Sequence, residues 1–151
     1  MKTTLLLVAL ISAIASAEPL PDKPQRAAGQ KQIDRLLEAE RPYIAKGKAT
    51  YPAAKKRYLA GLPRGYTFAV RKHLADRGGE RHEEVFVYID SIRGGTVYGR
   101  IASELTAVRS YRQGQHISFP ESEVWDWVII HPDGSEEGNY VGKFIDTYKP
   151  R

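Results

Sequence analysis

The segment from Tyr66 to Ala102 limits the possible folds more than any other part of the chain. Apolar and polar residues alternate along it, and glycine pairs interrupt the alternation at Gly78-Gly79 and Gly94-Gly95. A period of two is typical of β-strands, and adjacent glycines permit the positive φ angles of tight hairpin turns. We therefore expect an antiparallel meander of three strands, covering residues 66–74, 84–90 and 96–102.

The middle strand of this meander carries apolar residues on both faces. Val85, Val87 and Ile89 share one face, while Phe86 and Tyr88 lie on the other. A strand of this kind is covered on both sides. In the first strand, the alternation places Lys72 on the same face as Phe68 and Val70.

Other periodic segments predict helices and two more strands. An apolar stripe at helical spacing runs from Gln30 to Tyr51, with a boundary or kink expected at Pro42. Thr50-Tyr51-Pro52 is typical of the start of a second short helix, which would end near Gly61. Residues 116–120 form a short strand that stops at Pro120 or lies at an edge, residues 124–130 form a buried strand, and residues 139–148 form a terminal helix.

Together these elements predict an α+β fold. We expect N-terminal helices packed on a small antiparallel sheet of about five strands, followed by a short C-terminal helix or strand. The single domain would cover residues 31–148.

The first residues have the pattern of an export signal rather than of a folded element. Lys2 precedes an apolar run from Leu5 to Ala15, and Ala15-Ser16-Ala17 has the small residues of a cleavage site. We expect a signal peptide over 1–17, cleaved after Ala17, and a proline-rich flexible tether over 18–30. The protein would then be periplasmic or secreted. The apolar run is too short for a membrane-spanning helix, so no transmembrane anchor is expected.

Composition excludes several kinds of chemistry. The chain has no cysteine, which rules out disulfides, thiolate nucleophiles, iron–sulfur clusters and a lipid-modified N-terminal cysteine. Its net charge of +5 comes from cations scattered among acids, and no aromatic-basic motif of nucleic-acid binding is present. We expect no nucleic-acid partner.

Catalytic and metal motifs are also missing from the sequence. There is no G-x-S-x-G or S-x-x-K motif, and the histidines have no H-x-x-H or H-E-x-x-H spacing. His73 and His82 could meet across the first hairpin, but exposed strand histidines are the simpler interpretation. No catalytic residue, cofactor or metal is predicted.

The tryptophan-containing segment is the main candidate site. On a regular strand Trp125 and Trp127 point the same way and Asp126 points to the opposite face, so with Glu123 they could bind a ligand or a partner protein. The alternative is structural: one indole fills the core and Asp126 accepts main-chain hydrogen bonds at a corner.

Two further candidate sites carry charge. Lys55, Lys56 and Arg57 form either a solvated helix face or a patch that binds anionic polymers or lipid headgroups. The carboxylates of Glu121, Glu123 and Asp126 could serve a hydrolase if they met in a cleft, and are otherwise solvated charges.

Several segments are similar to a known family. The box Glu123-Val-Trp-Asp-Trp127 resembles the D-I-x-D-W box of the YegJ-like family, also called domain of unknown function 2314 (DUF2314). Asp133-Gly134 and Val141-Gly-Lys-Phe144 are similar to its turn and its V-G-G-[FY] ending, with Glu123 replacing Asp and Lys143 replacing Gly. Lys48-Ala-Thr-Tyr-Pro52, Gly95-Thr-Val-Tyr-Gly-Arg-Ile101 and the stretch from Gly114 to Phe119 also match.

The resemblance covers residues 41–148 and implies helices before an antiparallel sheet, with no activity attached. From the sequence we expect a non-catalytic binding or protein-interaction module of the cell envelope, with another envelope protein as its partner. The alternatives are a small hydrolase with clefted carboxylates and a binder of anionic envelope polymers or lipid headgroups.

Overall fold

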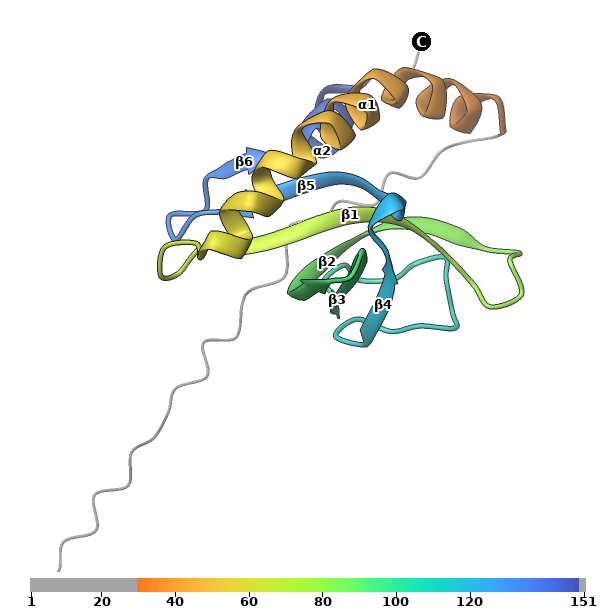
Figure 1. Cartoon of the computed structure of the whole chain (residues 1–151). Helices are drawn as coiled ribbons and strands as arrows, with labels where there is room; N and C mark the ends of the chain where they lie inside the picture. The colour runs from red at the N-terminus through yellow and green to blue at the C-terminus, as the bar shows by residue number, and fades with distance from the viewer. Residues whose placement is uncertain (1–29, 150–151) are drawn as a thin grey trace, which may run out of the picture.

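The computed structural model describes residues 30–149, so the predicted leader and nearly all of the predicted tether lie outside the described residues. Two helices accompany a six-stranded sheet (Figure 1). The elements in chain order are α1 (Gln30–Ala60), β1 (Thr67–Ala75), β2 (His82–Arg93), β3 (Thr96–Ile101), β4 (His116–Pro120), the 3-10 turn η1 (Glu121–Glu123), β5 (Val124–Ile130), β6 (Glu136–Gly138) and α2 (Tyr140–Thr147).

The sheet confirms the predicted α+β fold. Its strand order is β4-β3-β2-β1-β5-β6, and all neighbours are antiparallel. The predicted meander forms β1 to β3, and β4 lies at an edge and ends at Pro120, as expected. The strand β6 was not predicted. Because β5 pairs with β1 instead of β4, the chain crosses from one edge of the sheet back to its middle.

The structure has one N-terminal helix where the sequence pattern predicts more than one. One continuous helix, α1, passes through both Pro42 and Pro52. Each proline removes an amide donor inside the helix, but both are exposed, so the carbonyl groups left without a partner face water. The helix ends at Ala60 as predicted, with Gly61 at a φ of 95°.

The buried face of α1 is also different from the apolar stripe expected from the sequence. The residues that become buried are Glu40, Gly47, Tyr51 and Ala54. Their spacing places them on one side of the helix. By contrast, Leu37 stays 45% exposed. The contact face of α1 therefore contains a glycine and a carboxylate, whereas the sequence pattern predicts aliphatic side chains there.

Two apolar clusters form the core, on opposite faces of the strands. The larger cluster includes Val85 and Val87 of β2, and the smaller one includes Phe86 and Tyr88. This confirms that β2 is covered on both faces. In Figure 1, α1 lies across β5 and β1 with α2 beside it, while β2, β3 and β4 curve away on the other side.

A β-bulge interrupts the pairing of β5 with β1. Arg71 pairs with Asp126, whereas the next residue, Lys72, pairs with Val124, which leaves Trp125 as the extra residue. Trp125 stacks on His73, on the face of Arg71 and Asp126, while Trp127 joins the larger cluster on the opposite face. The expectation that the two indoles point the same way is therefore wrong, because the bulge shifts the alternation.

Gly47 lets α1 rest directly on this bulge. A Cβ atom at this position would lie 2.6 Å from the carbonyl oxygen of Trp125 and 2.8 Å from Oδ1 of Asp126. Neither distance is tolerated by ordinary van der Waals packing, so any larger side chain would push the helix away from β5.

Within residues 30–149, neither helix has the combination of length and apolar character that a membrane crossing requires.

We expect Gly47→Ala to destabilise the protein by about 1–3 kcal/mol because of this overpacking. At an exposed helix position the same substitution would stabilise the protein by about 1 kcal/mol. The sign of the change in the free energy of unfolding therefore distinguishes a tight contact from an open one. The free energy of unfolding, measured in urea, provides the test, with the exposed Lys48→Ala in the same helix as the control. An alanine variant as stable as the wild type would contradict the close contact.

Candidate functional site

Trp127 and Asp126 are structural in this fold. Trp127 is buried, and its Nε1 donates to Oγ1 of Thr50 on α1 at 2.8 Å. Asp126 has no exposed surface and accepts hydrogen bonds from the main-chain N–H groups of Trp127 (2.8 Å) and Val141 (2.7 Å). Burial raises the pKa of Asp126, and these two hydrogen bonds oppose the rise. The carboxylate thereby joins β5 to the first turn of α2.

The other two members of the predicted site are more accessible. Trp125 is half-buried, and its ring lies 5.4 Å from that of His73. The carboxylate of Glu123 is 47% exposed and lies 2.8 Å from Nζ of Lys72. The four residues of the predicted site therefore fall into two pairs. Asp126 and Trp127 stabilise the fold, whereas Glu123 and Trp125 reach the surface on different sides of β5.

The three carboxylates considered for a hydrolase have different partners. Glu121 accepts a hydrogen bond from the hydroxyl of Tyr51 at 3.0 Å and pairs with Lys55 at 2.7 Å. Glu123 pairs with Lys72, and Asp126 is enclosed beneath α2. This arrangement offers no support for a shared acid–base cleft.

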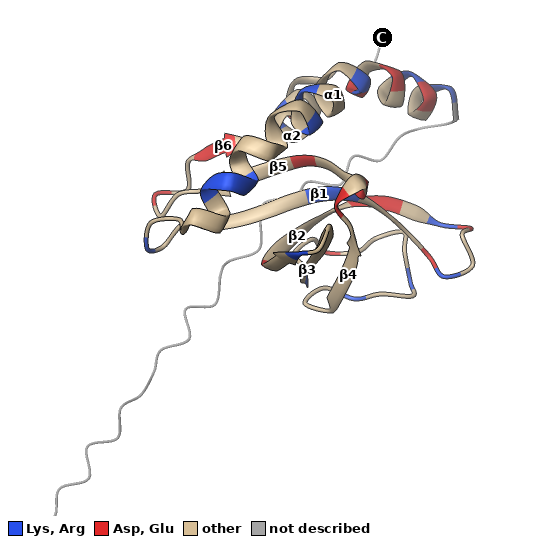
Figure 2. Ribbon diagram, viewed as in Figure 1, with Lys and Arg blue, Asp and Glu red and all other residues tan. Residues whose placement is uncertain are grey.

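Carboxylates neutralise most of the cationic cluster at the end of α1. Lys55 pairs with Glu121, and the guanidinium of Arg57 binds both oxygens of Glu137 at 2.6 and 2.9 Å. Lys56 is exposed. Figure 2 shows the blue cations of this helix end among red acids on the neighbouring elements. The surface is of mixed charge rather than a basic patch.

A group of buried ionisable residues lies between α1 and the sheet. Arg71 on β1 donates to Glu84 on β2 at 2.6 Å, and its guanidinium also lies 4.6 Å from the centre of the Phe86 ring. Glu40 of α1 is 2% exposed and shares a hydrogen bond with Glu84. Among the described residues, Nε of Arg71 and Oε2 of Glu40 have no partner.

This group holds more acids than bases. Arg71 is the cation facing Glu40, Glu84 and Asp126. Burial, reinforced by the neighbouring Glu84, raises the pKa of Glu40 to about 8. Glu40 therefore keeps its proton at neutral pH, and donates it to Glu84. Because these side chains are buried and pair with one another, the group contributes to stability.

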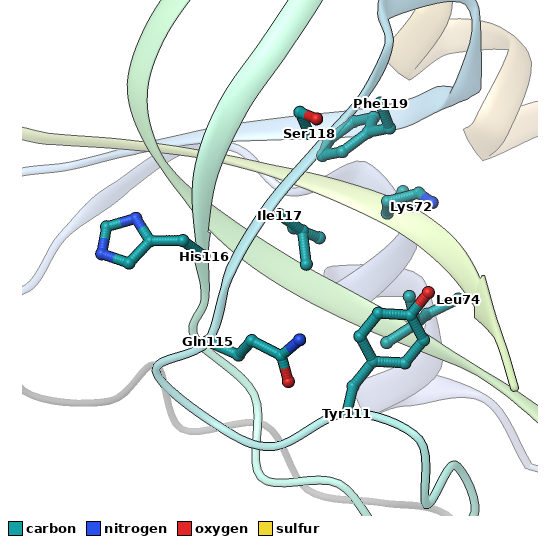
Figure 3. Close-up of a pocket in the computed structure, with 8 residues that line it drawn as sticks. All are labelled: Lys72, Leu74, Tyr111, Gln115, His116, Ile117, Ser118 and Phe119. Carbon is teal, nitrogen blue, oxygen red and sulfur yellow. The ribbon is translucent and has the colours of Figure 1, made fainter. Parts of the chain in front are cut away.

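A cavity lies between β4 and the far end of β1. Its volume is about 220 Å³. Lys72 and Leu74 line it from β1, Tyr111 and Gln115 from the segment before β4, and residues 116–119 from β4 itself (Figure 3). It combines the cationic side chain of Lys72 and several polar groups with the apolar side chains of Leu74, Ile117 and Phe119.

Lys72 supplies the charge of this cavity. Its side chain is only 9% exposed, and its Nζ lies 4.7 Å from the centre of the Phe119 ring. At the rim of the cavity, Nζ of Lys72 also forms the ion pair with Glu123. A lysine with a buried stem and one partly solvated partner is well suited to exchanging that partner for another anion.

The main chain of β4 adds polar groups to the same cavity. Ile101 donates its N–H to the carbonyl of Gln115, and Glu121 donates to Gly95, so the odd-numbered residues of β4 face β3. By alternation, the N–H and C=O groups of His116 and Ser118 face away from β3, at the free edge. In Figure 3 the side chain of His116 points away from the cavity, so it contributes its main chain.

Two carboxylates of the first hairpin hold Tyr111 in place. Asp76 accepts hydrogen bonds from the N–H groups of Ser110 (2.7 Å) and Arg109 (2.8 Å), which hold the pKa of Asp76 well below its usual range. Glu83 accepts from the N–H groups of Thr106 (3.0 Å) and Ala107 (2.9 Å). The segment between β3 and β4 has no regular secondary structure, yet it is anchored at both points.

The two histidines of the first hairpin come together, as the sequence allowed. The rings of His73 and His82 are tilted by 37° to each other, with centres 4.8 Å apart. Burial and the neighbouring His82 lower the pKa of His73. Throughout residues 30–149, no three histidine or carboxylate side chains converge in a way that could hold a metal ion.

Comparison with known proteins identifies the family. The family model described as "Uncharacterized protein conserved in bacteria (DUF2314)" matches residues 49–147. This span runs from the middle of α1 to the end of α2, and the chain belongs to this family. No curated protein and no solved structure matches the chain.

The structure also explains one departure from the family's ending. Gly142 is buried against Asn139, whereas Lys143 is exposed and donates from Nζ to the carbonyl of Gly138 at 2.8 Å. Lys143 therefore occupies a position with room for a side chain, whereas Gly142 lies too close to Asn139 for one.

Most residues of the cavity carry no recognisable signal in the sequence. Lys72 is the exception, because a cation that shares a strand face with Phe68 and Val70 indicates an unusual environment. Leu74 and Tyr111 carried no signal, because their meeting depends on how far the sheet curves and on where the segment before β4 is anchored.

The pKa of Glu40 predicts a pH-dependent stability. In the unfolded chain this carboxyl ionises near 4.5, so between about pH 5 and 8 the native state binds more protons and stability falls as pH rises. We expect Glu40→Gln, which cannot ionise, to be more stable than the wild type by about 4 kcal/mol near pH 8 and by about 1 kcal/mol near pH 5. Urea unfolding at several pH values measures this.

The exposed Glu38→Gln in the same helix is the matched control, and its effect should be small at every pH. A difference between Glu40→Gln and the wild type that stayed constant from pH 5 to pH 8 would contradict a protonated Glu40.

Proposed function

We propose that the protein is exported through the leader at residues 1–17 and acts in the bacterial cell envelope as a non-catalytic binding module, with the cavity between β4 and β1 as its binding site. The observation that carries this proposal is the cavity itself: the buried side chain of Lys72, three apolar side chains and the main-chain groups of the free edge meet there. Convergent polar groups beside apolar side chains are typical of binding sites.

The chemistry of the lining favours binding over catalysis. Lys72 already forms an ion pair with Glu123, at 2.8 Å. Among the described residues, no hydrogen bond joins the hydroxyl of Tyr111 or of Ser118 to a histidine or a carboxylate that could act as its base. A nucleophile needs such a partner for activation. The cavity thus has the groups for recognition and lacks a paired nucleophile and base.

The size of the cavity limits what it can enclose. At about 220 Å³, it is below the range of about 300–1,000 Å³ that holds whole drug-sized ligands. It fits a single side chain or a comparably small molecule. A binding module that takes one side chain of a larger partner agrees with the proposed role beside another envelope protein.

Export is tested with the full chain expressed in a bacterial host. We expect the mature protein to begin at Glu18, by intact mass, and to be recovered in the periplasmic fraction or the medium. Replacing the small residue before the cleavage site, Ala17→Arg, should block processing. An unprocessed wild-type chain that stays in the cytoplasm would overturn the exported role.

Binding in the cavity is tested by protein-observed NMR with isocaproate and its uncharged amide as probes. We expect amide shifts to cluster at Leu74, Tyr111 and Ile117 for at least one of them. The matched variants are Leu74→Trp, which fills the cavity and should abolish the shifts, and Leu59→Trp on the exposed side of α1, which should not. If neither probe moves these signals, the cavity is not a binding site.

A further inference from the structure

We infer that the cavity receives an extended acidic peptide, which adds as a strand to the free edge of β4 and places a carboxylate side chain against Lys72. This inference rests on the proposed function, because it names the class of partner for the same site. Three features of the described residues support it: the main-chain groups of β4, the charge inside the cavity, and two exposed cations close to Tyr111 in the chain.

The edge of β4 offers main-chain pairing over a short distance. His116 and Ser118 present their N–H and C=O groups outward, while Pro120 has no N–H to offer. A strand that adds here can exchange hydrogen bonds with those two residues and no further, which limits the paired segment to a few residues. Peptides bind to sheet edges in this way, with main-chain bonds giving affinity and pockets giving specificity.

The side chains of an added strand alternate, so one face of it points into the curved interior. Ile117 and Phe119 of β4 point toward that interior and line the cavity with Leu74. The central side chain of the peptide would therefore enter the cavity beside them. The volume of about 220 Å³ suits one such side chain.

Lys72 determines which side chain fits. Its side chain is nine-tenths buried, and an uncharged peptide side chain would leave the ammonium paired with Glu123 at the rim. A peptide carboxylate can replace Glu123, which is 47% exposed and returns to water at low cost. The exchange keeps the interior neutral, since one carboxylate leaves as another enters.

Two exposed cations close to Tyr111 in the chain favour the same ligand. Arg109 and Arg112 flank Tyr111 and are both exposed. They lie on the segment that Asp76 and Glu83 hold beside the cavity. An acidic peptide would be attracted by these cations as it approaches, and its binding would weaken with added salt.

The test uses three forms of one short peptide: Ac-Thr-Val-Glu-Val-Thr-NH2, its Gln analogue, and an analogue N-methylated on both valines. We expect the acidic form to shift the amide signals of His116 and Ser118, and both other forms to bind about tenfold more weakly or worse. The Gln form lacks the charge, and the N-methylated form lacks the main-chain donors.

Protein variants give the matching evidence. Lys72→Met should weaken the acidic peptide by about tenfold and leave the Gln peptide nearly unchanged, while Lys56→Met, an exposed lysine elsewhere, should change neither. Ser118→Pro should weaken the acidic and Gln forms alike, because it removes an outward N–H. If Ser118→Pro fails to fold, the N-methylated peptide still tests the same hydrogen bonds.

The outcomes separate this inference from the proposed function. If isocaproate binds in the cavity and the acidic peptide does not compete with it, the inference is overturned while the binding module stands. Equal affinity for the Glu and Gln peptides would overturn the role of Lys72. A dimer of the free protein that Ser118→Pro dissociates would show that a second copy, rather than a peptide, occupies the edge. If no probe binds, both proposals fail.

Discussion

The buried carboxylate of Asp126 is the interaction on which the rest of the structure depends. It accepts the N–H of Trp127 within β5 and the N–H of Val141 at the start of α2, and the backbone of α1 reaches it at Gly47. One side chain therefore connects the strand and both helices. Removing it would leave two main-chain donors without a partner in a dry interior, which costs more than the loss of the hydrogen bonds themselves. The proximity of Gly47 shows how tightly this point is packed.

Neighbouring cations on β1 have opposite environments, because successive residues of a strand point to opposite faces of the sheet. Arg71 faces Glu84, Glu40 and Asp126 on one side of the sheet, and Lys72 faces Glu123 and Phe119 on the other. The first cation offsets buried acids and stabilises the attachment of α1. The second pairs with an acid that lies at the rim of the cavity and is 47% exposed. The proposed binding role of Lys72, as opposed to the structural role of Arg71, rests on this difference in the solvent exposure of the partner carboxylates.

Local patterns predicted most of the sheet, while long-range contacts decided the candidate site. The alternation from Tyr66 to Ala102 and the glycine turns gave the meander correctly, and Pro120 correctly marked an edge strand. The prolines of α1 were misleading, because a helix tolerates them where the freed carbonyl groups face water. The direction of Trp125 was wrong because a bulge depends on the partner strand and has no signature in β5 itself. The cavity needed the curvature of the whole sheet, which no single segment encodes.

The position of β1 has a consequence for how the chain reaches its native state. β1 lies between β2, which follows it directly, and β5, whose Ile130 pairs with Thr67. Such distant pairing raises the contact order, and folding slows as loop closure must precede it. Until Val124 to Ile130 have been synthesised, the meander has one long apolar edge with no neighbour. Fragments that end before β5 are therefore expected to aggregate through β1.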